Sequence, residues 1–255
     1  MLIKFKKYQF LFEELVKRDF KQKYKRTILG MGWSLLSPLL QLFIMSIIFK
    51  QFFGRGMEHY TIYLFCGNLV FSYYKESTNG GMNALMSNSR IFTKVNVPKY
   101  MFLFSKNVSS LINFGLTLII FFIFVIADGV PIGIHFAALI YPILCLIVFN
   151  IGIGLILSAL FVFFRDIAYL YDIFTMLLMY MSAVFYTVES MAPWFQKAIL
   201  LNPVYIYIKY FRVITLEGHL PSLNHHILCL VYALIALAIG CWFYKKYNHK
   251  FLYYV

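Results

Sequence analysis

Side chains that could do chemistry are few and scattered in this 255-residue chain. The four cysteines lie far apart within apolar stretches, with no Cys/His ligand spacing, so we expect no metal site. No G-x-x-x-x-G-K-[ST] phosphate loop occurs in the sequence, and we therefore expect no ATP site of that kind. The pair His225-His226 has no nearby carboxylate or ligand partner along the chain. These patterns favour a protein that is not an enzyme.

Lys75 and Glu76 are the ionisable pair that interrupts one apolar stretch. Ionisable residues inside a membrane span usually face protein or water and are often functional. The alternative is a position near the end of the span, from which Lys75 reaches the lipid headgroups. The sequence leaves both interpretations open.

Composition places the elements around these residues in a membrane. The chain is 62% hydrophobic, 20% aromatic and 13% charged, with a mean hydropathy of +0.75, whereas soluble domains are about 25% charged. The net charge of +13 could indicate nucleic acid, but nucleic-acid-binding proteins do not carry several long uncharged apolar runs. We expect no nucleic-acid partner and interpret the charge as membrane topology and headgroup contact.

Charge-free runs long enough to cross a bilayer core of about 30 Å predict six transmembrane helices. They cover residues 27–49, about 60–86, 107–127, about 136–164, about 167–186 and about 227–245. Gly152 and Gly154 in the fourth run should permit close helix packing. Most Lys and Arg residues fall on the side of both termini, which predicts that both termini are cytoplasmic.

Two further segments flank these runs. Residues 1–28 alternate aromatic and basic faces with helical spacing, which predicts an amphipathic helix in the headgroup layer. Residues 189–226 are neither a polar loop nor long enough for two crossings. We expect two short helices broken at Asn202-Pro203, either dipping into the outer leaflet or lying at the interface with aromatic anchors. The predicted fold is all-α, with 29–255 as the transmembrane domain.

Four segments together resemble the polysaccharide-export permeases of the ABC-2 class. These segments are RDFKQKYKRTILGMGWSLLSPL, MSNSRIFTKVNVPKYMF, FRDIAYLYDIF and SAVFYTVESMAPWFQKAILLNPVYIYIKYFR. They cover nearly the whole chain in the order that the family has.

The resemblance implies a permease subunit in the bacterial inner (plasma) membrane that exports a lipid-linked polysaccharide, such as O-antigen, capsule, rhamnan or teichoic acid. It implies a homodimer paired with two ATP-binding subunits, which would hold ATP and Mg, and no cofactor on this chain. Two alternatives are an ABC-2 exporter of a small lipid or drug, and a membrane-embedded glycosyl or acyl transferase. The basic segment RDFKQKYKR before the first predicted span argues against the small-lipid or drug exporter. The Asp and Glu residues are scattered along the chain, which argues against the transferase.

The resemblance also implies a coupling helix at about residues 86–99 that docks on the ATP-binding subunit. Its candidate residues are Arg90, Phe92, Lys94, Val95 and Pro98. The candidate residues of the interface helix are Arg18, Asp19, Tyr24 and Arg26.

A glycan path needs flat aromatic faces against which sugar C–H surfaces pack, with tyrosines that exchange hydrogen bonds with hydroxyls. The candidates are Trp33, Phe71, Tyr73, Tyr74, Lys75, Tyr171, Tyr180, Phe185 and Tyr186. The segment 189–226 would form an outer gate. Its candidate residues are Trp194, Asn202 and Pro203.

Overall fold

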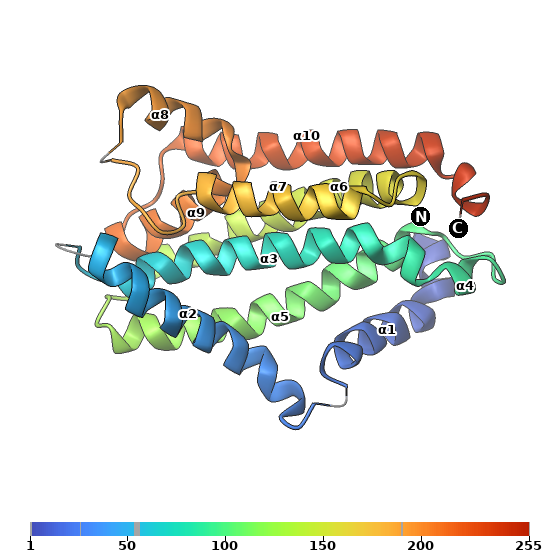
Figure 1. The fold of residues 1–255 in the computed structure, drawn as a ribbon, viewed down its shortest axis with the longest axis horizontal. Coiled ribbons are helices and arrows are strands. Elements are labelled where there is room, and N and C mark those ends of the chain that lie inside the picture. The colour runs from blue at the N-terminus through green and yellow to red at the C-terminus, as the bar shows by residue number, and fades with distance from the viewer. Residues whose placement is uncertain (1, 26, 54–56, 190, 255) are drawn as a thin grey trace.

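The computed structural model describes residues 2–25, 27–53, 57–189 and 191–254, and this part of the chain is helical without strands. The helices are α1 (Leu2–Tyr24), α2 (Trp33–Phe53), α3 (Tyr60–Ser87), α4 (Ser89–Phe92), α5 (Tyr100–Ala127), α6 (Ile140–Phe163), α7 (Ile167–Met181), α8 (Pro193–Ala198), α9 (Pro203–Arg212) and α10 (Leu223–Tyr247). The start of α1, α4 and the tail after α10 lie at one end of the bundle, which we call the termini end (Figure 1). Helices α8 and α9 lie toward the far end.

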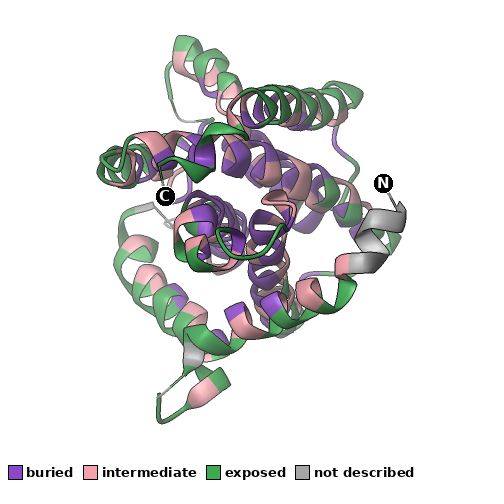
Figure 2. Ribbon diagram, turned by 90° about the vertical axis from the view of Figure 1, so that its right-hand side faces the viewer, coloured by how far each residue is buried: buried purple, intermediate pink, exposed green. Residues whose placement is uncertain are grey.

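Helix α3 is the centre of the bundle. It packs against α5, α6, α9 and α2, and its side chains are buried along most of its length. Figure 2 shows the buried residues gathered in the middle, with exposed residues on the outward faces of the surrounding helices. Those outward faces are apolar, as on α7 and α10, which is the pattern of helices that contact lipid.

Among the residues that the structure describes, four helical segments have the length and apolarity to cross a membrane. They are Gly30–Phe52, Tyr100–Ala127, Ile134–Phe163 and Leu223–Tyr247. A fifth crossing is possible if the bent pair Pro193–Leu201 and Pro203–Glu217 counts as one span. Helix α3 has 28 residues but is more polar, and α7 has only 15. The count of six spans stays a prediction, as does the place of α1 in the headgroup layer.

Two helices are shorter than expected. In the segment 86–99, α3 ends at Ser87 and one further turn, α4, is helical. Pro98 disfavours the helical conformation of Val97, so a single helix does not continue to Lys99. Helix α7 ends at Met181 rather than near Tyr186. Ala183 follows with a positive φ of 50°, a conformation that interrupts a helix.

The predicted break at Asn202-Pro203 is confirmed, with a bend of 106°. Asn202 caps α9 by accepting hydrogen bonds from the backbone N–H groups of Val204 and Tyr205, and Pro203 takes the first helical position, where its missing N–H costs nothing. The Asn202 amide also donates to the Met181 carbonyl at 3.1 Å. The break therefore fixes the start of α9 to the end of α7.

Both glycines of α6 make the close contacts predicted for them. A Cβ on Gly152 would overlap the backbone of Ala236 in α10, and a Cβ on Gly81 of α3 would lie 3.0 Å from the Cα of Gly154. Helix α6 thus approaches α10 and α3 at backbone distance on two sides. In lipid, where apolar burial between helices gains little, such small-residue contacts provide much of the packing energy.

Helix α1 is fixed to the bundle through the buried carboxylate of Asp19. Its Oδ1 atom accepts from Arg18 Nη2 at 2.7 Å and pairs with Lys106 Nζ of α5 at 3.0 Å. Ser105 Oγ donates to Oδ2 at 3.2 Å. Because Asp19 is only 6% exposed, removal of its charge would leave cations without a buried partner, which is costly.

We predict that Gly152→Ala lowers the stability of the protein by roughly 1–3 kcal/mol, because the new methyl group overlaps the α10 backbone. Thermal unfolding in detergent, followed by helical circular dichroism, measures the effect. Gly115→Ala is the matched control, since nothing lies within 4 Å of a Cβ at that helical glycine. Equal midpoints for the two variants would contradict the packing described for α6.

We predict that Asp19→Asn loosens α1 and exposes it to protease. Limited trypsin digestion in detergent should cut at Lys17 or Lys21 several-fold faster than in the unchanged protein. Glu14→Gln is the control, because Glu14 makes an exposed pair with Lys17 on the same helix, and exposed pairs contribute little. Unchanged cleavage in Asp19→Asn would show that another contact holds α1.

Candidate functional site

The termini end presents the segment 88–99, which links α3 to α5 and which we call the linking segment. Arg18 Nη2 donates to Asn88 Oδ1 at 2.7 Å, and Tyr8 Oη donates to the Asn96 carbonyl at 3.2 Å. Arg18 therefore touches both Asp19 and the first residue of the linking segment. These bonds join α1, α5 and the linking segment in one hydrogen-bonded unit.

The C-terminal tail holds the other side of the linking segment. Lys99 Nζ donates to the Asn248 carbonyl at 2.7 Å and lies over the rings of Phe92 and Phe251, 5.8 and 5.5 Å from their centroids. Burial lowers the pKa of the Lys99 ammonium group from its ordinary value. The linking segment is thus clamped between α1 and the tail.

The five predicted coupling residues divide by exposure. Arg90, Lys94 and Val95 are exposed, Pro98 is half-buried, and Phe92 is buried in the core. Arg90 and Lys94 therefore have the accessibility that a contact with another subunit requires. Phe92 does not, because its ring packs against the Phe102 ring of α5.

The four predicted interface-helix residues are described only in part. Arg18 and Asp19 form the network above. The side chain of Tyr24 and the whole of Arg26 lie outside the described residues.

The predicted path residues are mostly buried rather than assembled along an open surface. Phe71, Tyr73, Tyr74, Tyr171 and Phe185 are core side chains. Tyr171 Oη donates to Thr78 Oγ1 at 2.6 Å and lies 3.2 Å from Tyr74 Oη. Within one copy of the chain these five side chains are buried between helices, and their place along a glycan path stays a prediction.

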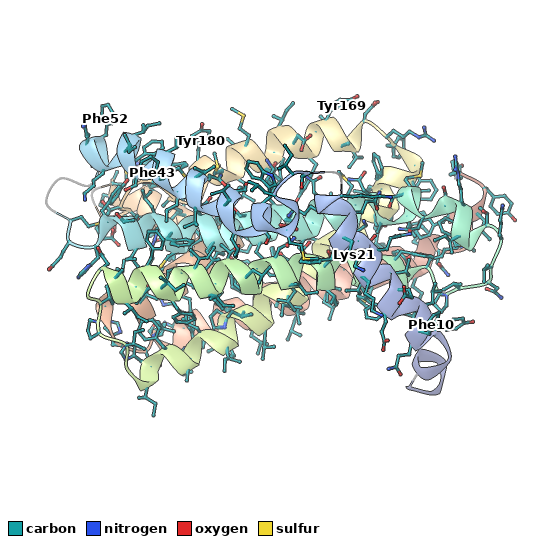
Figure 3. All side chains as sticks on the ribbon, turned by 90° about the horizontal axis from the view of Figure 1, so that it is seen from below. Phe10, Lys21, Phe43, Phe52, Tyr169 and Tyr180 are labelled. Carbon is teal, nitrogen blue, oxygen red and sulfur yellow. The ribbon has the colours of Figure 1, made fainter. Side chains whose placement is uncertain are left out.

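The remaining path candidates are accessible. Trp33 is 38% and Tyr180 is 51% exposed, Lys75 is exposed, and Tyr186 is half-buried. Figure 3 shows Tyr169 and Tyr180 of α7 projecting from the same side of the bundle as Phe43 and Phe52 of α2. Helices α2 and α7 therefore present aromatic side chains on one side of the molecule.

A polar cavity of about 410 Å³ lies between α2, α3 and α5. Two predicted path residues, Trp33 and Tyr73, line it. The polar lining comes mainly from Ser34, Ser37 and Gln41 of α2, Asn68, Ser72 and Glu76 of α3, and Ser110, Asn113 and Thr117 of α5. We call this cavity the polar groove.

The polar groove contains an ion pair that the sequence did not reveal. Lys23 Nζ of α1 lies 3.0 Å from Glu76 Oε1, and Asn113 Nδ2 donates to the same oxygen at 2.6 Å. Of the two ionisable neighbours, Glu76 thus faces the groove, while Lys75 is exposed and does not line it.

Spacing within the sequence carried a signal for the polar groove that we missed. On α3 the residues 68, 72 and 76 recur at four-residue steps, and on α5 the residues 110, 113 and 117 recur at three- and four-residue steps. Such spacing puts each set on one helix face. Two polar faces within apolar helices would have predicted a shared polar site.

The far end holds a buried cation that we also did not predict. Arg212 of α9 is 6% exposed, donates to the Val184 carbonyl at 3.0 Å and stacks on the Tyr63 ring, 3.4 Å from its centroid. It lines a cavity of about 400 Å³ together with Lys209, Glu58 and Glu189. The ring and the carbonyls disperse its charge.

The three predicted gate residues do not line this cavity. Trp194 is 71% exposed at the start of α8. Asn202 and Pro203 form the bend between α8 and α9.

Among the described residues, no three His, Cys, Asp or Glu side chains are grouped as a metal site requires.

Three relatives match this chain over most of their length. The O-antigen export system permease protein RfbA of Klebsiella pneumoniae is 26% identical over 95% of both chains. Its namesake from Myxococcus xanthus is 26% identical over 84% of both. The polysialic acid transport protein KpsM of Escherichia coli is 22% identical over 94% of both. Residues 11–216 match the family described as ABC-2 type transporter. The chain is a membrane protein that belongs to this ABC-2 transporter family.

Proposed function

We propose that this chain is the transmembrane subunit of an exporter that moves a lipid-linked polysaccharide outward across the bacterial inner membrane. The observation that carries the proposal is similarity over nearly the full length to permeases named for O-antigen and polysialic acid export. These names favour a polysaccharide over a small lipid or drug, and a permease over a transferase.

The energy for export would come from separate ATP-binding subunits. The sequence has no phosphate loop of its own, so ATP and Mg would be held by two such subunits, paired with two copies of this chain. The exposed Arg90 and Lys94 give these subunits a basic contact at the termini end. Lys245 and Lys246 at the end of α10 add to the positive charge there, which supports a cytoplasmic position for this end.

Motion would pass from the ATP-binding subunits through the linking segment. A push on Arg90 and Lys94 would act on Asn88, which Arg18 joins to Asp19 and thus to Lys106. Helix α1 would then move together with the adjoining ends of α3 and α5. Because the network is buried and charged, it favours concerted over independent motion of these elements.

The glycan would pass between α2 and α7 of the two copies. Exposed side chains on these helices, Trp33 and Tyr180, are the accessible aromatic candidates. The bent pair α8 and α9 would serve as the outer gate, with Asn202 fixing it to the end of α7.

We predict that the chain co-purifies with an ATP-binding subunit in mild detergent, identified by mass spectrometry of intact complexes. Deletion of the gene should remove the polysaccharide from the cell surface and leave lipid-linked polymer inside. A preparation without an ATP-binding partner, from cells that retain surface polysaccharide after deletion, would contradict the proposed function.

We predict that Arg90→Glu with Lys94→Glu uncouples the complex, lowering export about tenfold while the chain still inserts. This effect corresponds to about 1.4 kcal/mol of coupling free energy, within the usual range. Export of polysaccharide per ATP hydrolysed, in membranes with equal amounts of protein, measures it. Lys245→Glu with Lys246→Glu makes the same charge change at the same end and should have little effect. Equal export by both double variants would remove Arg90 and Lys94 from the coupling surface.

A further inference from the structure

The polar groove is built to hold hydroxyl groups rather than a charged ligand. Its two charged lining residues, Lys23 and Glu76, pair at 3.0 Å and so neutralise each other. The other polar lining groups are hydroxyls and amides, such as those of Asn68, Ser72 and Thr117. These groups both donate and accept hydrogen bonds, as a ligand with several hydroxyls requires.

Size and aromatic faces fit a sugar unit. A volume of about 410 Å³ falls within the usual range for small-molecule sites, about 300–1,000 Å³. Trp33 and Phe114 line the groove beside the polar residues, and their rings offer flat apolar faces. A pyranose ring presents C–H groups on its faces and hydroxyls on its rim, so it matches both kinds of lining.

A second polar cavity extends the groove toward the termini end. Its volume is about 350 Å³, and it shares Lys23, Glu76 and Ser110 with the polar groove. It continues to Asp19 and Lys106, where α1 is fixed to α5. A polar headgroup at the membrane surface therefore has a polar route into the groove.

The faces of α2 and α5 that point away from the groove are apolar. They carry the exposed residues Phe43 and Ile47 of α2 and Ile112 and Ile119 of α5, and lipid chains contact helix faces of this kind. Helices α2 and α5 lie on the same side of α3 (Figure 1). An amphiphile could thus place its head in the groove while its tail stays among the lipids. Ser72 donates to Asn68 Oδ1, Asn113 to Glu76 Oε1 and Thr117 to the Asn113 carbonyl, and the hydroxyl oxygens of Ser72 and Thr117 have further lone pairs with which to accept hydrogen bonds from a ligand.

We propose that the polar groove binds the uncharged sugar headgroup of a membrane amphiphile, with Asn68, Ser72, Asn113 and Thr117 bonding the hydroxyls and Trp33 packing on the ring. The proposal rests on the proposed function in one respect, since sugar is the group that the exporter would carry. The same headgroup chemistry could come from the lipid-linked glycan or from a glycolipid of the bilayer.

Binding can be measured on the purified chain in phosphatidylcholine nanodiscs. The double variant Trp194→Phe with Trp242→Phe leaves Trp33 as the one tryptophan, since the sequence has three. Monoglucosyl-diacylglycerol and prenyl-phosphoryl-glucose are the sugar probes, and diacylglycerol is the probe without sugar. We expect a saturable change in Trp33 emission with a sugar probe and none with diacylglycerol.

Two groove variants should weaken binding about five- to tenfold each, as expected for the loss of one hydrogen bond. They are Asn113→Ala and Thr117→Val, of which the second keeps the side-chain shape. Asn83→Ala is the matched control, because Asn83 lies on α3, is exposed and lines neither cavity.

The outcomes distinguish a lipid-linked glycan from a glycolipid of the bilayer, and they test the groove separately from the proposed export function. A response to prenyl-phosphoryl-glucose alone supports the groove as a site for the exported glycan, and a response to the glucosyl lipid supports it as a glycolipid site. Equal responses to diacylglycerol and the sugar probes, or equal affinities in Thr117→Val and Asn83→Ala, would overturn the proposal. Because binding needs no ATP-binding subunit, failure of export leaves this test unaffected.

Discussion

A polar helix cannot stand alone in lipid, and this constraint on α3 organises the rest of the structure. Helix α3 carries Glu76 and a series of hydroxyl and amide side chains within its 28 residues, and each polar group in a low-dielectric interior needs a partner. Glu76 finds Lys23 and Asn113, and Ser77 donates to Asn107 at 2.5 Å. The surrounding helices therefore enclose α3, and their apolar outer faces are left for lipid.

The same constraint links the polar part of α3 to the termini end. Helix α3 leads directly into Asn88 and the linking segment, and α1 contacts both ends of this polar region, through Lys23 at Glu76 and through Arg18 at Asn88. A subunit that pushes on the linking segment would thus act on the polar centre of the bundle. The pair of Asp19 and Lys106 would carry this motion into α5.

Much of the fold followed from charge-free runs, turn residues and glycine spacing, because each acts locally. The break at Asn202-Pro203 and the contacts of Gly152 are examples. These patterns did not predict which aromatic rings are buried. Tyr73 and Tyr74 are neighbours on different faces of α3, and both are buried because helices surround α3 on several sides. Partners distant in sequence, such as Lys23 with Glu76 or Arg212 with Tyr63, depend on how helices pack, which local patterns do not specify. The polar groove lies between these cases. The spacing of its polar residues on α3 and α5 can be read from the sequence, but the packing of α2 over them cannot.

Transport in a defined membrane tests the central claim most directly. Proteoliposomes that contain this chain and its ATP-binding partner would receive lipid-linked polysaccharide in the leaflet that faces ATP. The glycan in the opposite leaflet would be measured by its access to a glycosidase added on that side. The account predicts that glycan appears there only with hydrolysable ATP. ATP hydrolysis without any glycan crossing, while a small lipid or drug is moved instead, would contradict it.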